Sequence, residues 1–290
     1  MKIGFNVFLL PLQVLAGVAR KADELGFESI WISDHLIWPK EIRTVYPYEP
    51  NPYTLGRVGP HTPLLDPFVT LSYIAAITSR VRLGIGVYIL PLRNPLVTAR
   101  AAVTVDVLSG GRLLLGIGMG WMEEEFTIAG EDFGTRVKRA EECVQVLKAL
   151  WTQQEPEFHG RFFDFGPAKF EPKPVQRPHP PIVLGGESEA ALRRTAMLGD
   201  GWYGIGGACS TPESAARRVE RLRQLRREAG RENEPFEISV SPGGRLTLDD
   251  IARFQEAGVD RLLVSPWSGG DEIEDLERFA HEVLHKLPFL

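Results

Sequence analysis

The residue pair with the clearest chemistry in this sequence is Asp34-His35, which closes a short apolar run that begins at Ser29. Histidine is the usual proton shuttle because its unperturbed pKa lies near neutrality, and an adjacent carboxylate can fix its tautomer. Asp34 could instead cap the following segment, and a histidine at the start of a loop is often only solvated. The pair predicts proton transfer if the fold places the end of this run at a site.

Glycines interrupt or end the next two apolar runs. Gly84 and Gly86 lie inside Val81–Ile89, where glycine indicates a bulge, a close approach of a ligand to the backbone, or tight packing. The stretch Gly116-Ile-Gly-Met-Gly120 ends the following run, and its spacing is not the G-x-G-x-x-G fingerprint of dinucleotide binding. These glycines would let a flat ring or a phosphate chain lie against the backbone.

A fourth stretch, Gly185-Gly186-Glu187-Ser188, joins an apolar run to an amphipathic one, with Glu187 or Ser188 at the N-cap. Helix N–H groups and a serine hydroxyl together favour an anion such as phosphate. The charge of Glu187 would repel phosphate unless the side chain turns away, and capping alone explains the serine. An anion site and a plain helix cap are both open at this point.

Other polar clusters carry weaker signals. His281 and His285 lie four residues apart on a predicted helix, but no third ligand accompanies them, so we expect no metal site. Glu123-Glu124-Glu125 opens a helical turn and is interpreted as solvated charge. Neither a G-x-S-x-G elbow nor a P-loop occurs, so hydrolase and NTPase functions lack support.

The elements that must position these residues alternate along the chain in the pattern of parallel βαβ units. The predicted strands are Lys2–Leu9, Ser29–Asp34, Val81–Ile89, Arg112–Gly118, Pro181–Gly185, Gly201–Ile205, Phe236–Ser241 and Arg261–Pro266. The predicted helices are Leu12–Leu25, Pro67–Ser79, Pro95–Leu108, Arg136–Trp151, Glu189–Leu198, Pro212–Gly230, Leu248–Ala257 and Asp271–Leu287. Four helices are followed by glycine, which supplies a left-handed residue at a helix end: Leu25-Gly26, Ser109-Gly110-Gly111, Leu198-Gly199 and Ala257-Gly258.

Eight strand–helix units in 290 residues predict an α/β fold, a TIM (β/α)8 barrel that spans residues 1–290 as a single domain. Chemistry in this fold gathers at the C-terminal strand ends, where Asp34-His35 and the glycine stretches fall. An open doubly wound sheet is the main alternative, but it usually has a glycine-rich turn after its first strand, and this chain has Leu-Pro-Leu-Gln there.

The remaining length is predicted to form insertions after the second strand, after the fourth strand and after the fourth helix. Residues 38–66 are rich in proline and aromatic residues, and we expect them to form an active-site lid that places Trp38 and Tyr53 in an apolar substrate pocket. Residues 152–180 contain Phe158–Phe165, which alternates like a hairpin around His159-Gly160, and this insertion is predicted to be structural or interfacial.

Composition excludes several partners. There are 33 Lys and Arg against 38 Asp and Glu, a net charge of −5 with no basic block, so we expect no nucleic acid partner. Cys143 and Cys209 offer no C-x-x-C spacing, which fits a reducing compartment. No apolar run approaches the roughly 20 residues that span a membrane. The apolar start, Ile3–Ala19, imitates a secretory signal but is interrupted by Asn6 and Pro11 and carries the first strand, so we expect a cytoplasmic protein.

From Ser29 to Leu36 the chain resembles the luciferase-like (bacterial luciferase) superfamily of flavin and deazaflavin oxidoreductases. The likeness continues through Arg82–Pro95, Leu108–Arg112, Gly116–Phe126 and Pro181–Trp202, and it is greatest to the branch that uses the deazaflavin coenzyme F420. The resemblance implies a TIM barrel, usually a homodimer, that binds the cofactor ring at its C-terminal mouth and acts on a small molecule.

The resemblance also implies roles for matched residues. Asp34 would contact the coenzyme, and His35 would donate or accept a proton at its reactive face. A bulge with a non-proline cis peptide at Gly86-Val87 would lie behind the ring. The other cofactor-binding positions that it implies are Met119, Glu124, Gly185, Gly186, Glu187 and Ser188.

Two matched positions depart from the family pattern. Sugar-phosphate dehydrogenases of the branch carry a catalytic glutamate where this chain has Trp121, so the resemblance gives Trp121 a catalytic position and disfavours that substrate class. Bacterial luciferase has an arginine that binds the flavin phosphate where this chain has Met119, which disfavours FMN.

The sequence therefore predicts an F420-dependent oxidoreductase that transfers a hydride between the deazaflavin and an organic, apolar or aromatic substrate. The first alternative is an FMN-dependent two-component luciferase-like monooxygenase supplied by a flavin reductase. The second, from another class, is a flavin- or deazaflavin-binding protein without catalytic activity.

Overall fold

The computed structural model describes residues 1–48, 51–52 and 58–287. Its main sheet contains β1 (Lys2–Asn6), β2 (Ser29–Ile32), β3 (Arg82–Ile85), β4 (Tyr88–Ile89), β5 (Leu113–Gly118), β8 (Ile182–Gly185), β9 (Gly201–Ile205), β10 (Glu237–Ser241) and β11 (Arg261–Val264). The α-helices are α1 (Leu15–Leu25), α2 (Pro67–Ile77), α3 (Pro95–Leu108), α4 (Glu123–Ala129), α5 (Arg136–Thr152), α6 (Glu189–Leu198), α7 (Pro212–Glu228), α8 (Leu248–Glu256) and α9 (Glu272–Glu282).

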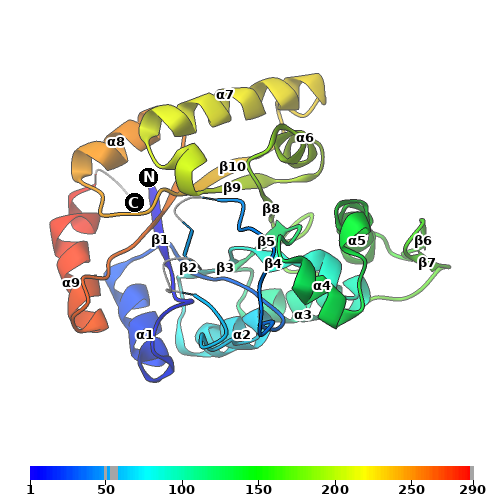
Figure 1. The fold of residues 1–290 in the computed structure, drawn as a ribbon, viewed down its shortest axis with the longest axis horizontal. Coiled ribbons are helices and arrows are strands. Elements are labelled where there is room, and N and C mark those ends of the chain that lie inside the picture. Colours follow the sequence, from blue (N-terminus) through cyan, green and yellow to red (C-terminus); the bar gives the residue numbers. More distant parts are fainter. Residues whose placement is uncertain (49–50, 53–57, 288–290) are drawn as a thin grey trace.

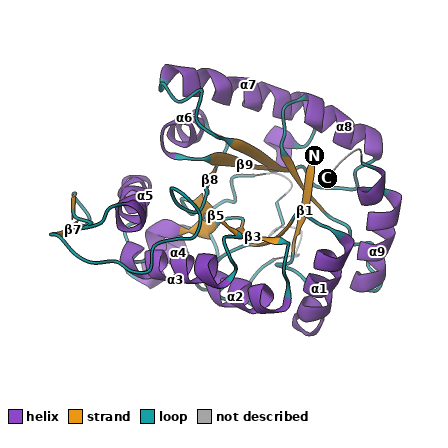
Figure 2. Cartoon of the chain, turned by 180° about the vertical axis from the view of Figure 1, so that it is seen from behind, coloured by secondary structure: helices purple, strands orange, loops and turns teal. Residues whose placement is uncertain are grey.

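The sheet closes on itself. Its strand order is β3-β2-β1-β11-β10-β9-β8-β5-β4, and β3 also pairs with β5, so the two ends of the order meet. All of these pairings are parallel, and helices surround the strands (Figures 1 and 2). The prediction of a TIM barrel is confirmed, and its C-terminal strand ends share one mouth.

The predicted strand Val81–Ile89 is divided into β3 and β4. The division falls at Gly86 and Val87, whose peptide bond is cis, as the resemblance implied. The first strand is shorter than predicted because the Asn6 side chain accepts the N–H of Phe8 (2.8 Å) and turns the chain out of the sheet.

Glycines inside the barrel strands serve packing. A Cβ at Gly84 would overlap the Trp31 indole, and one at Gly116 would overlap the carbonyl of Ile85. The prediction that glycine provides a left-handed helix end holds at three of the four joints, but it is wrong at Gly199, whose φ is −87°. There a Cβ would lie 3.0 Å from the carbonyl oxygen of Thr195, so close packing explains the glycine.

Large side chains fill the barrel below its mouth. Trp31 and Tyr203 stack with ring centroids 5.6 Å apart. Arg261 is fully buried and forms ion pairs with Glu28 (2.7 Å) and Glu237 (2.9 Å). Because these side chains fill the barrel interior, the space open to a ligand lies at the C-terminal ends of the strands.

The insertions after β5 and after α5 lie outside the barrel wall. Phe158–His159 (β6) and Asp164–Phe165 (β7) form a hairpin, as predicted, but its turn spans residues 160–163 and His159 belongs to a strand. The hairpin projects beyond α5 at the edge of the molecule (Figure 1). The insertion after β5 forms α4. None of the helices in the described residues is both long and apolar enough to cross a membrane.

Candidate functional site

A cavity of about 1070 Å³ lies at the C-terminal strand ends. Its walls include residues of the segment after β2, the bulge between β3 and β4, the segment after β5 and the joint between β8 and α6. The sequence-predicted residues that line it are Asp34, His35, Gly86, Val87, Met119, Trp121, Gly185, Gly186, Glu187 and Ser188. Trp38 and Glu124 do not line it, and Tyr53 lies outside the described residues.

His35 is held in the cavity wall by a carboxylate from α4. Its Nδ1 donates to Glu125 Oε2 (3.0 Å), and the two side chains are 8% and 0% exposed. The other oxygen of Glu125 accepts the N–H groups of Leu36 (2.5 Å) and Ile37 (3.4 Å). One buried carboxylate thus orients the imidazole and fixes the backbone beside it.

The sequence interpretation of Glu125 as solvated charge was wrong. Glu125 was expected to be solvated with its two neighbours, yet it is fully buried. The signal that could have identified it is spacing: Glu125 lies three residues after the apolar, buried Met122, and residues three apart lie on the same side of a helical turn.

Aromatic side chains surround His35. The Trp38 ring lies 4.5 Å from the imidazole, and the indole N–H donates to the carbonyl of Thr62 (2.8 Å). Trp121 meets His35 edge to face at 6.4 Å and also contacts Tyr46 at 5.1 Å. The imidazole therefore packs against aromatic rings, one of which, Trp121, belongs to the cavity wall.

Asp34 is bound to protein groups on both carboxylate oxygens. Arg93 forms an ion pair with Oδ2 (2.7 Å) and donates to Oδ1 (2.8 Å), and the Ile89 N–H donates to Oδ2 (2.9 Å). Burial raises the pKa of Asp34, while Arg93 and the Ile89 N–H favour the carboxylate form. Asp34 thus links the end of β2 to β4, on the far side of the bulge.

Hydrogen bonds from neighbouring strands hold the bulge. Ser33 donates to the carbonyl of Gly86 (3.0 Å), and Asn6 donates to Ser33 (3.0 Å). The Val87 side chain packs close to Gly185, where a Cβ would lie only 3.1 Å from it. The bulge is therefore a rigid part of the cavity floor.

The joint between β8 and α6 caps a helix. Ser188 is the N-cap and accepts the N–H of Ala191 (3.2 Å), so the capping interpretation holds. Glu187 accepts the N–H of Ile205 (3.0 Å), and burial raises its pKa. Its carboxylate is directed to β9, and the dipole of α6 still favours an anion at this end of the cavity.

Two arginines that the sequence analysis missed line the same end: Arg136 and Arg194. The Nε of Arg194 donates to Glu141 (2.8 Å), and no other polar contact of its guanidinium is found among the described residues. Burial lowers the pKa of Arg136; the Glu123 carboxylate opposes this effect and the Arg194 charge adds to it. The spacing of Ala190 and Arg194, which puts both on one face of α6, could have indicated that Arg194 lines the cavity.

Glu124 binds the segment that follows β2. Its carboxylate accepts the N–H groups of Arg43 (2.7 Å) and Thr44 (3.0 Å) and the Thr44 hydroxyl (2.8 Å). Tyr46 and Tyr48, a few residues further on, line the cavity. Glu124 therefore anchors a segment that lines the cavity and does not itself line it.

Replacing Glu124 with glutamine is expected to lower the melting temperature by a few degrees at pH 7. Burial opposes ionisation, but the N–H groups of Glu124, Arg43 and Thr44 lower the pKa of this carboxyl from 4.5 to about 2. A depressed pKa stabilises the fold fully above pH 4.5 and loses that effect as pH falls toward 2. The difference between wild type and E124Q, measured by calorimetry, should shrink over that range. E123Q is the control, and a constant E124Q difference would contradict the prediction.

Comparison with known sequences identifies the family pattern. The family model described as luciferase-like monooxygenase matches residues 10–261. The chain is 34% identical to an uncharacterized protein of Mycobacterium tuberculosis, over 97% of this chain and 96% of that protein. It is 37% identical to the FMNH(2)-dependent dimethylsulfone monooxygenase of Pseudomonas putida, over 48% of this chain and 39% of that protein.

Solved structures share the fold. Monooxygenase RslO1 from Streptomyces bottropensis matches with a TM-score of 0.77 and 22% identity, over 98% of this chain and 99% of that chain. An F420-dependent secondary alcohol dehydrogenase, solved with an F420-acetone adduct, matches with a TM-score of 0.75 and 17% identity, over 99% of both chains.

Proposed function

Because the chain belongs to the luciferase-like monooxygenase family, we propose that it is an F420-dependent oxidoreductase that transfers a hydride between the deazaflavin and an organic, apolar or aromatic substrate. Members of this family are oxidoreductases or monooxygenases. The observation that carries the proposal is His35, oriented by the buried Glu125 in the cavity wall. Solved neighbours of the same fold include F420-dependent enzymes.

The cavity suits a long molecule with a flat ring and an anionic end. Its volume of about 1070 Å³ is at the upper end of ordinary small-molecule sites. Arg136, Arg194 and the start of α6 supply positive charge at one end, and Trp121 and Tyr46 supply aromatic surface elsewhere. Both F420 and FMN combine a flat ring with a phosphate. The positive and aromatic groups of the cavity therefore fit either cofactor.

Some residues of the cavity would bind the cofactor, and His35 would transfer a proton. F420 would supply the hydride chemistry. Gly86 and Val87 would support the ring, and Arg194 would hold the phosphate end. Glu125 accepts a hydrogen bond from His35 Nδ1, and the imidazole so oriented would exchange a proton with the substrate. Trp121 and Tyr46, whose rings contact each other in the cavity wall, would shield the reacting atoms from water.

Titration of the purified apoprotein with F420 and, separately, with FMN tests the cofactor. Tryptophan quenching is expected to report micromolar or tighter binding of F420 and much weaker binding of FMN. Binding of neither cofactor would reject the proposal. A preference for FMN would favour the second candidate, an FMN-dependent monooxygenase supplied by a reductase, which the FMNH(2)-dependent relative supports. Oxygen uptake with reduced FMN would then identify it.

Replacing Arg194 with alanine is expected to weaken cofactor binding about 10- to 100-fold, because a hydrogen bond to a charged group contributes about 1.5–3 kcal/mol. Arg193 is the matched control: it is the preceding residue, is 54% exposed and pairs with Glu189 (3.0 Å). R193A should bind the cofactor like the wild type. Equal affinities of R194A and wild type would show that the phosphate lies elsewhere.

We also propose that the protein is a homodimer. On the neighbouring helices α2 and α3, Val69, Val97 and Leu108 are 70%, 69% and 66% exposed, and contact with a second copy would cover them. Sedimentation equilibrium should give twice the chain mass of 32.3 kDa. A monomeric mass at micromolar concentration would reject a stable dimer.

A further inference from the structure

Helix α4 carries the carboxylate that holds His35, and its first residue is capped by a side chain from another part of the chain. The N-cap position, Met122, makes no capping hydrogen bond with its side chain. The backbone N–H of Glu123 donates instead to the hydroxyl of Thr44 (3.2 Å), which lies 79 residues earlier in the sequence. A hydroxyl that is distant in sequence therefore does for α4 what a serine or threonine N-cap does within its own helix.

The Thr44 hydroxyl is bound in both directions. It accepts the Glu123 N–H and donates its own proton to Glu124 Oε2 (2.8 Å). The backbone N–H of Thr44 donates to Glu124 Oε1 (3.0 Å), and Thr44 is half-buried. These hydrogen bonds attach Thr44 to the first turn of α4.

Glu125 belongs to the turn that Thr44 caps. Helix α4 has seven residues, and a helix this short is marginal without contacts from the rest of the fold. Glu125 is its third residue, and its carboxylate accepts hydrogen bonds from His35 Nδ1 (3.0 Å) and from the Leu36 N–H (2.5 Å). If the first turn frays, Glu125 loses the fixed direction that these hydrogen bonds require.

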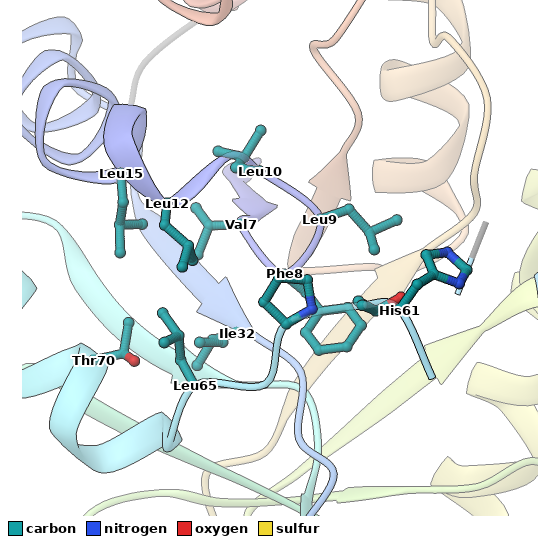
Figure 3. Close-up of a pocket in the computed structure, with 12 residues that line it drawn as sticks. Val7, Phe8, Leu9, Leu10, Leu12, Leu15, Ile32, His61, Leu65 and Thr70 are labelled. Atoms are coloured by element: carbon teal, nitrogen blue, oxygen red, sulfur yellow. The ribbon is translucent and has the colours of Figure 1, made fainter. Parts of the chain in front are cut away.

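The later part of the segment after β2 is attached at a different place. His61 and Leu65 line a small pocket together with Phe8, which follows β1 (Figure 3). The residues that line this pocket do not include any from α4. Loss of the Thr44 hydroxyl would therefore free the first turn of α4 and leave this part of the segment in place.

We propose that Thr44 is a positioning residue for His35: its hydroxyl caps α4 and thereby keeps the Glu125 carboxylate on the imidazole. The proposal rests on the proposed function, in which His35 transfers a proton. Thr44 does not line the cavity, so it acts on His35 only through α4.

Replacing Thr44 with valine removes the hydroxyl and keeps the shape of the side chain, whereas T44S keeps the hydroxyl. Hydrogen exchange of backbone amides, followed by NMR on protein without cofactor, is the first measurement. The Leu36 amide should exchange about 2- to 30-fold faster in T44V, which is the range that loss of an N-cap gives. T44S should match the wild type. T44A removes the same hydroxyl and should repeat the result if T44V fails to fold.

Exchange of the His35 Nδ1 proton with water is the second measurement, because this proton lies in the hydrogen bond to Glu125. Its exchange rate should rise in T44V by a factor similar to that of the Leu36 amide and return to the wild-type rate in T44S. Neither measurement needs F420 or turnover, so a failure here is separate from a failure of the proposed function.

Two controls distinguish a local effect from a general loss of stability. T127V makes the same substitution on the same helix, where the exposed Thr127 donates to the carbonyl of Glu123 (3.2 Å). The Leu36 amide should exchange in T127V as in the wild type. The Leu83 amide, which donates to the carbonyl of Arg112 (2.9 Å) in the barrel, should exchange at the same rate in every variant.

Faster exchange at Leu36 and at His35 Nδ1 in T44V, reversed in T44S and absent in T127V, supports the proposal. Unchanged exchange in T44V, an equal acceleration at Leu83, or a T44S variant that behaves like T44V would overturn it.

Discussion

Replacing His35 with asparagine is expected to lower turnover about 10²- to 10⁴-fold, which is the usual contribution of a positioned general acid or base. Asparagine can still donate a hydrogen bond to Glu125 from its amide, so the buried carboxylate keeps a partner. It cannot accept and release a proton near neutral pH. The variant therefore removes proton transfer while it preserves the local hydrogen bonding.

Three measurements separate this effect from misfolding and from loss of binding. Steady-state turnover should fall, while the melting temperature and the cofactor dissociation constant should change little. His281 provides the control, since it is exposed on α9, and H281N should behave like the wild type. If H35N altered cofactor affinity alone, or no turnover existed to lose, a cofactor-binding protein without catalytic activity would be the better description.

Replacing Asp34 with alanine is expected to destabilise the fold by about 3–5 kcal/mol, because removing one partner of a buried ion pair leaves an uncompensated charge. Arg93 is only 14% exposed, and Asp34 is fully buried. The Ile89 N–H would also lose its acceptor beside the bulge. The free energy of unfolding from urea titration measures this loss.

An exposed ion pair serves as the control for the buried Asp34–Arg93 pair. Glu155 and Lys169 are 64% and 66% exposed, so E155A should cost less than about 1 kcal/mol. The sequence resemblance gives Asp34 a different role, direct contact with the coenzyme. If D34A retained full stability and lost only cofactor affinity, that role would be correct and the positioning role drawn from the structure would be wrong.

The sequence by itself was sufficient to predict the barrel and to bring the candidate site residues to one mouth. Periodicity along the chain separates strands from helices, and parallel βα units bring successive C-terminal strand ends to one mouth. Asp34-His35, Gly86-Val87 and Gly185–Ser188 were therefore predicted to meet, and they line one cavity. These relations depend on local patterns and on a repeated topology, which a single sequence carries.

Only the tertiary structure decided what the charged residues do. Glu125 and Glu124 are adjacent in sequence, yet the first is buried against His35 and the second holds Arg43 and Thr44. Arg193 and Arg194 are adjacent arginines of α6, but only Arg194 lines the cavity. The partner and the burial of a charge depend on segments that are distant along the chain, and local sequence does not specify which face of a helix meets them. Packing of α4 and α6 against the barrel mouth assigns these roles.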